Sequence, residues 1–191
     1  PLKPACANST NAEASVAWPH RSISSSGVNK RSSKSSPRGT TISAPAAGQV
    51  DRGLRDLAGG WHDAGDYNKY VWTAVSNAAL FLLGAWEERP GLFPDGGLGI
   101  PESGNGVSDL LDELRWELDF LLKMQLPDGS VLSRLHADGS AWGAAPPSRD
   151  PSPRFYHDPT LESGAVFAGT CALASRSFAL AGDPSYSLAP L

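Results

Sequence analysis

Apolar residues recur at steps of three and four positions in three stretches of the chain, the spacing that gives an α-helix one apolar face. The three stretches cover residues 70–86, 108–125 and 161–181. Pro90 follows the first stretch, and Gly182 and Pro184 follow the third, where such residues are typical of helix ends. The pattern therefore predicts three amphipathic helices.

The middle stretch also carries the polar residues expected at the two ends of a helix. Ser108 stands where an N-cap residue belongs, and Asp109 and Asp112 place negative charge near the positive end of the helix dipole. Lys123 places positive charge in the last turn, near the negative end of the dipole. These residues support a helix over 108–125.

Long segments punctuated by Gly and Pro separate the three stretches, over residues 89–107 and 127–159. No segment alternates apolar and polar residues strongly, although residues 130–135 could pair briefly as a strand. The fold class that we expect is therefore all-α. Loops of this length between packed helices are where binding and catalytic sites usually lie.

The first 58 residues show no period. Residues 21–43 are rich in Ser, Lys and Arg and have almost no large apolar side chains, so they cannot bury enough surface to offset the entropy of ordering. We interpret the basic run over residues 30–38 as a solvated insertion rather than a targeting or nucleic-acid patch. We therefore divide the chain into an irregular Ser-rich and basic segment, residues 1–58, and a folded part, residues 59–191.

The formal net charge of −4 combines two opposite halves. The first 58 residues carry a balance of +5 and the remainder a balance of −9. An acidic folded part disfavours nucleic acid as a partner and suits a neutral substrate. No run approaches the about 18 apolar residues of a membrane span, and no signal peptide is visible. The two cysteines, Cys6 and Cys171, do not form a disulfide framework.

Residues 59–70 hold the densest group of residues suited to chemistry. Asp63 and Asp66 stand three positions apart around a glycine, between the aromatic residues Trp61 and Tyr67. Two carboxylates can orient and deprotonate one water molecule, and aromatic faces can stack on sugar rings, as glycoside hydrolysis requires. The spacing alone also fits a calcium-binding loop or a pair of turn aspartates.

The run from Gly60 to Val71 resembles the signature of glycoside hydrolase family 9, the endoglucanases and related cellulases. A second block, residues 100–113 with the helix over 115–125, resembles the segment that follows this signature, and a weaker match lies at 153–176. The resemblance implies a partial (α/α)6 barrel with about three of the barrel helices. It also implies an extracellular enzyme that hydrolyses β-1,4-glucosidic bonds in cellulose or related β-glucans with inversion.

By this resemblance, Asp66 is the general base that deprotonates the attacking water and Asp63 holds that water. Trp61, Tyr67 and Trp142 are expected to contact the sugar, although Trp142 could equally anchor its loop or belong to the core. His136 lies near Trp142 but does not match the register of a histidine found in that loop in some members of the family. The expected partner is a β-glucan, with neither nucleic acid nor a membrane.

The resemblance also implies a general acid, which in the family is a Glu near the C-terminal end of the domain. Glu102, Glu117 and Glu162 do not match it, and Glu117 is interpreted as part of the polar face of its helix. We therefore expect a portion of a catalytic domain with little or no hydrolysis of its own. The alternatives are a catalytically inactive β-glucan-binding fragment and a small all-α scaffold whose aspartates bind calcium.

Some members of the family bind a structural zinc ion through two Cys and two His. His62 and Cys6 would correspond to two of these ligands, but Ala7 stands where the second His is expected. Two ligands do not make the closed tetrahedral site of a structural zinc. We therefore expect no required cofactor, and neither zinc nor calcium has a complete ligand set.

Overall fold

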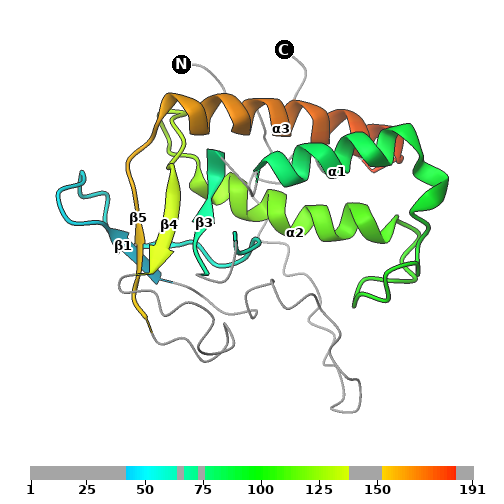
Figure 1. Ribbon diagram of the computed structural model, residues 1–191, viewed down its shortest axis with the longest axis horizontal. Helices are drawn as coiled ribbons and strands as arrows, with labels where there is room; N and C mark the ends of the chain where they lie inside the picture. Colours follow the sequence, from blue (N-terminus) through cyan, green and yellow to red (C-terminus); the bar gives the residue numbers. More distant parts are fainter. Residues whose placement is uncertain (1–41, 64–66, 73–75, 138–151, 184–191) are drawn as a thin grey trace.

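Three helices lie along one another in the computed structural model, which describes residues 42–63, 67–72, 76–137 and 152–183. They are α1 (Ser76–Glu88), α2 (Asp109–Met124) and α3 (Leu161–Leu180), and a short 3-10 turn, η2 (Pro90–Leu92), follows α1. Helix α1 packs against both α2 and α3 (Figure 1). The three predicted helices are confirmed, and α2 and α3 begin and end within one residue of the predicted bounds.

The N-terminus of α3 carries a capping box, which the sequence analysis did not identify. The Ser163 N–H donates to Thr160 Oγ1 at 3.2 Å, and the Thr160 N–H donates to Ser163 Oγ at 3.1 Å. Ser163 Oγ also donates to the Val131 carbonyl at 2.7 Å, which joins the helix start to the loop after α2. At α2 the N-cap residue is Ser108 as predicted, but its side chain makes no capping hydrogen bond.

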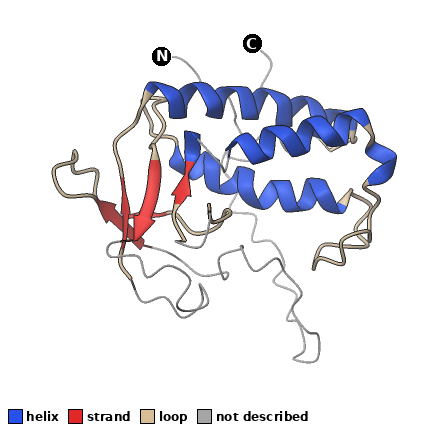
Figure 2. Ribbon diagram, viewed as in Figure 1, coloured by secondary structure: helices blue, strands red, loops and turns tan. Residues whose placement is uncertain are grey.

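A five-stranded sheet lies at one end of the helices (Figure 2), so the described residues are not all-α as expected. Its strands are β1 (Ile42–Pro45), β2 (Arg55–Asp56), β3 (Lys69–Tyr70), β4 (Arg134–Ala137) and β5 (Arg154–Tyr156). Their order is β2-β1-β5-β4-β3, and only the β1–β5 pair is parallel. Strands of two to four residues are too short to show the alternation by which strands are recognised in a sequence.

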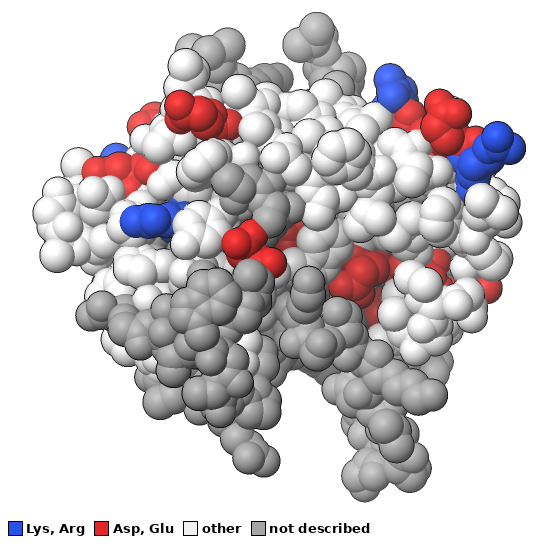
Figure 3. All heavy atoms as spheres, in the orientation of Figure 1, with Lys and Arg blue, Asp and Glu red and all other residues white. Residues whose placement is uncertain are grey.

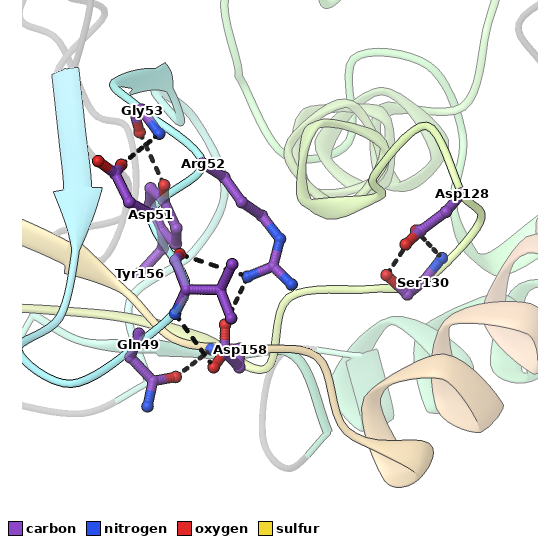
Figure 4. Close-up of polar contacts among 9 residues, drawn as sticks. Gln49, Asp51, Arg52, Gly53, Asp128, Ser130, Tyr156 and Asp158 are labelled. Carbon is purple, nitrogen blue, oxygen red and sulfur yellow. Dashed lines mark hydrogen bonds and ion pairs between the residues drawn. The ribbon is translucent and has the colours of Figure 1, made fainter.

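Strands β1 and β2 fall within the first 58 residues, which are therefore not irregular throughout. The connection between these strands is fixed to β5 by polar contacts (Figure 4). Arg52 forms an ion pair with Asp158 at 2.5 Å, and the Tyr156 hydroxyl donates to the Gly53 carbonyl at 2.7 Å. The Asp158 N–H donates to Gln49 Oε1 at 2.6 Å. Residues 1–41 lie outside the described residues, so the domain boundary at residue 58 stays a prediction.

Side chains from all three helices and from the strands fill one apolar core. Its largest fully buried members are Leu57, Leu83, Leu111, Leu114, Leu118, Phe120, Leu121, Met124, Leu132, Tyr156, Phe167 and Phe178. Cys171 on α3 is buried among them. No helix in the described part of the chain has the length and apolar character that crossing a membrane requires.

Candidate active site

The two aspartates of the motif belong to a loop whose ends run beside each other. We call residues 58–69 the aspartate loop. The Asp63 N–H donates to the Asn68 carbonyl at 2.7 Å, which brings the two sides of the loop together. The side chain of Asp63 is half-buried. Asp66 is one of residues 64–66, which lie outside the described residues.

A strained residue turns the chain at the second side of the aspartate loop. Tyr67 has a φ of 58°, and it is the only described residue other than glycine with a positive φ. This left-handed conformation costs about 1–2 kcal/mol for a residue with a side chain. Polar contacts to the Tyr67 carbonyl hold it: His62 Nδ1 lies at 2.7 Å, and Arg154 donates at 3.3 Å. Such strain is typical of functional sites.

The first side of the aspartate loop lies on α2 through polar contacts. The Trp61 N–H donates to Glu117 Oε2 at 2.5 Å, and the Trp61 indole N–H donates to Glu113 Oε1 at 2.8 Å. Lys123 donates to the Ala58 carbonyl at 2.9 Å. The Trp61 side chain is partly buried against the core, and its contact with a sugar stays a prediction.

The second side of the loop is fixed to the sheet. Asn68 Oδ1 accepts the Ala137 N–H at 3.0 Å, and Lys69 pairs with Leu135 in the β3–β4 ladder. The Lys69 ammonium group also crosses to the first side, where it donates to the Gly59 carbonyl. The aspartate loop is therefore held between a helix and a sheet, the two kinds of element that best fix the place of catalytic side chains.

Two of the residues that hold the loop are buried charges. Glu117 has no exposed surface, so its interpretation as part of a polar helix face is wrong. Burial raises the pKa of Glu117, and the Trp61 N–H and the charge of Lys69 oppose that shift only in part. Burial lowers the pKa of Lys69, partly offset by the charge of Glu117. Both residues are thus shifted toward their neutral forms.

The segment before α2, which includes the second family-like block, folds around aspartate side chains. Asp109 is buried, and its carboxylate accepts hydrogen bonds from the N–H groups of Gly96 and Leu98 at 3.0 and 2.7 Å and from Ser103 Oγ at 2.7 Å. Burial alone would raise the pKa of Asp109, but these hydrogen bonds outweigh it and lower the pKa. Asp109 therefore orders this segment as a carboxylate.

A histidine pair lies on the sheet next to the strand end that contacts Asn68. His136 on β4 and His157, directly after β5, are joined at 2.8 Å between His136 Nδ1 and His157 Nε2. Burial lowers the pKa of His157 to about 4, with further lowering by the charges of Arg134 and His136. His136 is thus placed in the sheet, beside His157.

Trp142 and Cys6, two of the predicted site residues, lie outside the described residues. His62 is buried and its ring lies 5.2 Å from that of Tyr67. Within the described ranges, no three His, Cys, Asp or Glu residues come together as a metal-binding group. Because Cys6 and Asp66 lie outside the described residues, the structure does not test zinc or calcium binding, and both stay predictions.

The residues that hold the loop were not identified from the sequence, although one pattern pointed to Glu117. It lies three positions after Leu114 and four before Leu121, and this spacing places it on the same helix face as these two apolar residues. A carboxylate on such a face must be buried with a partner. On the face shown in Figure 3, acidic side chains lie both near the middle and at the edges, and the basic ones lie toward the edges.

Comparisons with known proteins match these features to one family. Residues 7–191 match the family described as Glycosyl hydrolase family 9. Endoglucanase D of Acetivibrio thermocellus is 38% identical over 135 residues, which are 70% of this chain and 21% of that protein. A cellulose 1,4-beta-cellobiosidase of the same organism is 36% identical over 137 residues, which are 64% of this chain and 15% of that protein.

A solved structure shares the fold of the described helices and sheet. The crystal structure of a metagenome-derived glycoside hydrolase family 9 endoglucanase superposes with a TM-score of 0.67 at 39% identity, and the match covers 74% of this chain and 26% of that one. The chain therefore spans between about a seventh and a quarter of the length of these relatives. The match to the family starts at residue 7, well before the motif at residue 59.

Proposed function

This chain belongs to glycosyl hydrolase family 9, and on that basis we propose that the protein containing it hydrolyses β-1,4-glucosidic bonds in cellulose or a related β-glucan. Its relatives include an endoglucanase and a cellobiosidase. The reaction inverts the anomeric carbon. Because the substrate is a polymer too large to enter a cell, the protein acts outside the cell.

The observation that carries this proposal is the closure of the aspartate loop. The Asp63 N–H donates to the Asn68 carbonyl, which brings together the described residues on the two sides of the motif. In the proposed mechanism Asp63 orients a water molecule. Asp66 removes a proton from that water as its oxygen attacks the anomeric carbon from the side opposite the leaving group.

An acid must protonate the leaving oxygen in the same step. In inverting enzymes the acid and the base lie about 6.5–9.5 Å apart, which leaves room for the water. Glu113 and Glu117, the two glutamates that contact the described part of the aspartate loop, both accept hydrogen bonds from Trp61. We therefore assign the role of the acid to neither of these two glutamates.

The experiment uses the complete protein and measures reducing-sugar release from carboxymethyl cellulose. We expect Asp66→Asn to lower turnover by about a thousandfold while substrate binding is retained, because general base catalysis contributes on that order. Asp128→Asn is the matched control, since Asp128 is exposed and its side chain accepts hydrogen bonds from Ser130 of its own turn. Retained turnover in Asp66→Asn would show that Asp66 is not the base.

Two further measurements complete the test. The first sugar released from a cello-oligosaccharide should be the α-anomer by NMR, and a β-anomer would exclude inversion. A wild-type protein that binds β-glucan without releasing sugar would instead be a binding module.

A further inference from the structure

Glu117 and Lys69 are two charged side chains that the fold buries beside the aspartate loop. Glu117 is 0% exposed and Lys69 is 3% exposed. Glu117 comes from α2, and Lys69 is the first residue of β3, at the end of the loop itself. A buried charge is unfavourable unless hydrogen bonds and an opposite charge compensate it, so each of these side chains calls for an explanation.

Each of the two side chains contacts the backbone of the first side of the loop. Glu117 Oε2 accepts the Trp61 N–H, and Lys69 Nζ donates to the Gly59 carbonyl. Glu117 Oε1 has no hydrogen-bond partner among the residues that the structure describes. The Lys69 ammonium group also lies 4.8 Å from the centre of the Phe120 ring. The polar compensation of this pair is thus incomplete.

Both contacts lie close to the aspartates along the chain. Trp61 is two residues before Asp63, and Lys69 is three residues after Asp66. Glu117 therefore fixes the first side of the loop to the helix, and Lys69 fixes the distance between the first and second sides. A shift at either contact would therefore move the described residues beside the aspartates, Asp63 among them.

We propose that Glu117 and Lys69 are positioning residues, which hold the two sides of the aspartate loop in the geometry that the proposed water-activating aspartates require. This inference rests on the proposed function, because it assigns the two residues a role through Asp63 and Asp66. Neither residue is proposed to touch the substrate.

The physical balance of two opposite charges buried in the same region favours a positioning role over a purely stabilising one. The cost of removing two charges from water often equals or exceeds their attraction, so such pairs contribute little net stability. The raised pKa of Glu117 and the lowered pKa of Lys69 agree with a desolvation cost that the pair does not fully recover. Removing the pair should therefore affect the position of the loop more than the stability of the fold.

The test compares variants of the complete protein. Glu117→Leu keeps the approximate size of the side chain but removes the acceptor of the Trp61 N–H. The double variant Glu117→Leu with Lys69→Met removes both polar side chains, so neither is left buried without the other. The control is Asp112→Asn, which changes another buried carboxyl of α2 whose contacts are with Asn105 and Arg115, away from the loop.

We expect Glu117→Leu and the double variant to lower kcat on carboxymethyl cellulose by about tenfold or more, since small misplacements of catalytic groups have effects of this order. KM should change less than about twofold, because groups that touch the substrate are unchanged. Amide hydrogen exchange at Trp61 and Lys69 should be faster than in Asp112→Asn. In that control kcat should stay within about twofold of wild type.

The proposal is overturned if both variants keep kcat, if kcat falls only in proportion to the folded fraction measured by circular dichroism, or if Asp112→Asn loses as much. Asp66→Asn, assayed in parallel, separates the two proposals. Turnover retained by Asp66→Asn removes the proposed base. An inactive Asp66→Asn together with an unaffected Glu117→Leu removes only the positioning role.

Discussion

Gly60 lies so close to Phe120 that a β-carbon on Gly60 would stand 2.5 Å from Phe120 Cγ. Gly60 also has a φ of +70°. We expect Gly60→Ala to lower the free energy of unfolding by about 3 kcal/mol, because left-handed strain and overpacking against a buried ring both contribute. Urea denaturation would measure this loss. Because Gly60 precedes Trp61, the same variant should also disturb the aspartate loop.

Gly53→Ala is the matched control for this prediction. Gly53 has a φ of +74°, but a β-carbon there would meet nothing within 4 Å. Only the backbone strain of about 1 kcal/mol should therefore remain. Equal losses of stability in the two variants would show that the close approach of Gly60 to Phe120 does not add to the cost of the β-carbon.

The segment between η2 and α2 depends on the Asp109 carboxylate. Asp109→Asn should lower the free energy of unfolding by about 2 kcal/mol, because one amide oxygen replaces two acceptor oxygens and an NH2 group would face N–H donors. The exposed control Asp128→Asn should change it by less than about 0.5 kcal/mol. Thermal unfolding of both variants would measure the difference, and a neutral Asp109→Asn would exclude the hydrogen-bonding role.

His157 makes the free energy of unfolding sensitive to acid. Its pKa is lowered to about 4 by burial and by the neighbouring charges of Arg134 and His136, against the opposing charge of Asp158. Between pH 6.5 and 4 the unfolded chain therefore binds a proton that the folded chain does not, so stability is lost as the pH falls. Because His157 is only half-buried, we expect a loss of about 1 kcal/mol.

His157→Gln should remove this contribution. Denaturant unfolding of the wild type and the variant at pH 4.5 and pH 7 would show it as a smaller loss on acidification in the variant. Parallel stabilities of the two proteins over this range would contradict the assignment to His157.

Glu117 should affect the pH dependence of stability in the opposite direction to His157. Its pKa is raised above the ordinary value of 4.5 by burial and by Glu113, opposed by the Trp61 N–H and Lys69. As the pH rises above 4.5, the folded protein keeps a proton that the unfolded chain has lost, so this contribution to stability declines with rising pH. Glu117→Gln should therefore gain stability relative to wild type between pH 5 and pH 7, and a constant difference would contradict it.

The helices could be predicted from the sequence because their apolar positions repeat within each segment. The start of α1 could not: the pattern from residue 70 onward fits a helix, but Lys69 and Tyr70 pair instead with Leu135 and Arg134. That pairing depends on residues about 65 positions away, and no local period reports it. The same reason explains why the sheet was not expected.

The aspartate motif could be found from residue types and spacing, but the residues that hold it could not. Glu117 was assigned to a polar face because carboxylates are usually exposed. Only the packed structure shows that the aspartate loop lies against α2. There the Trp61 N–H donates to Glu117, and Lys69 is buried as well. Residues close together in the sequence therefore identify the motif, whereas residues distant in the sequence hold it in place.

The parallel pairing of β1 with β5 also sets an order of events in folding. Ser43 pairs with Arg154 and Pro45 with Tyr156, more than a hundred positions apart. Closing so long a stretch is slow, and β1 leaves the ribosome well before its partner exists. Until then it is an unpaired strand on which other chains can associate. In pulse-labelled refolding, the amides of β1 should gain protection after those of α2, and simultaneous protection would contradict this order.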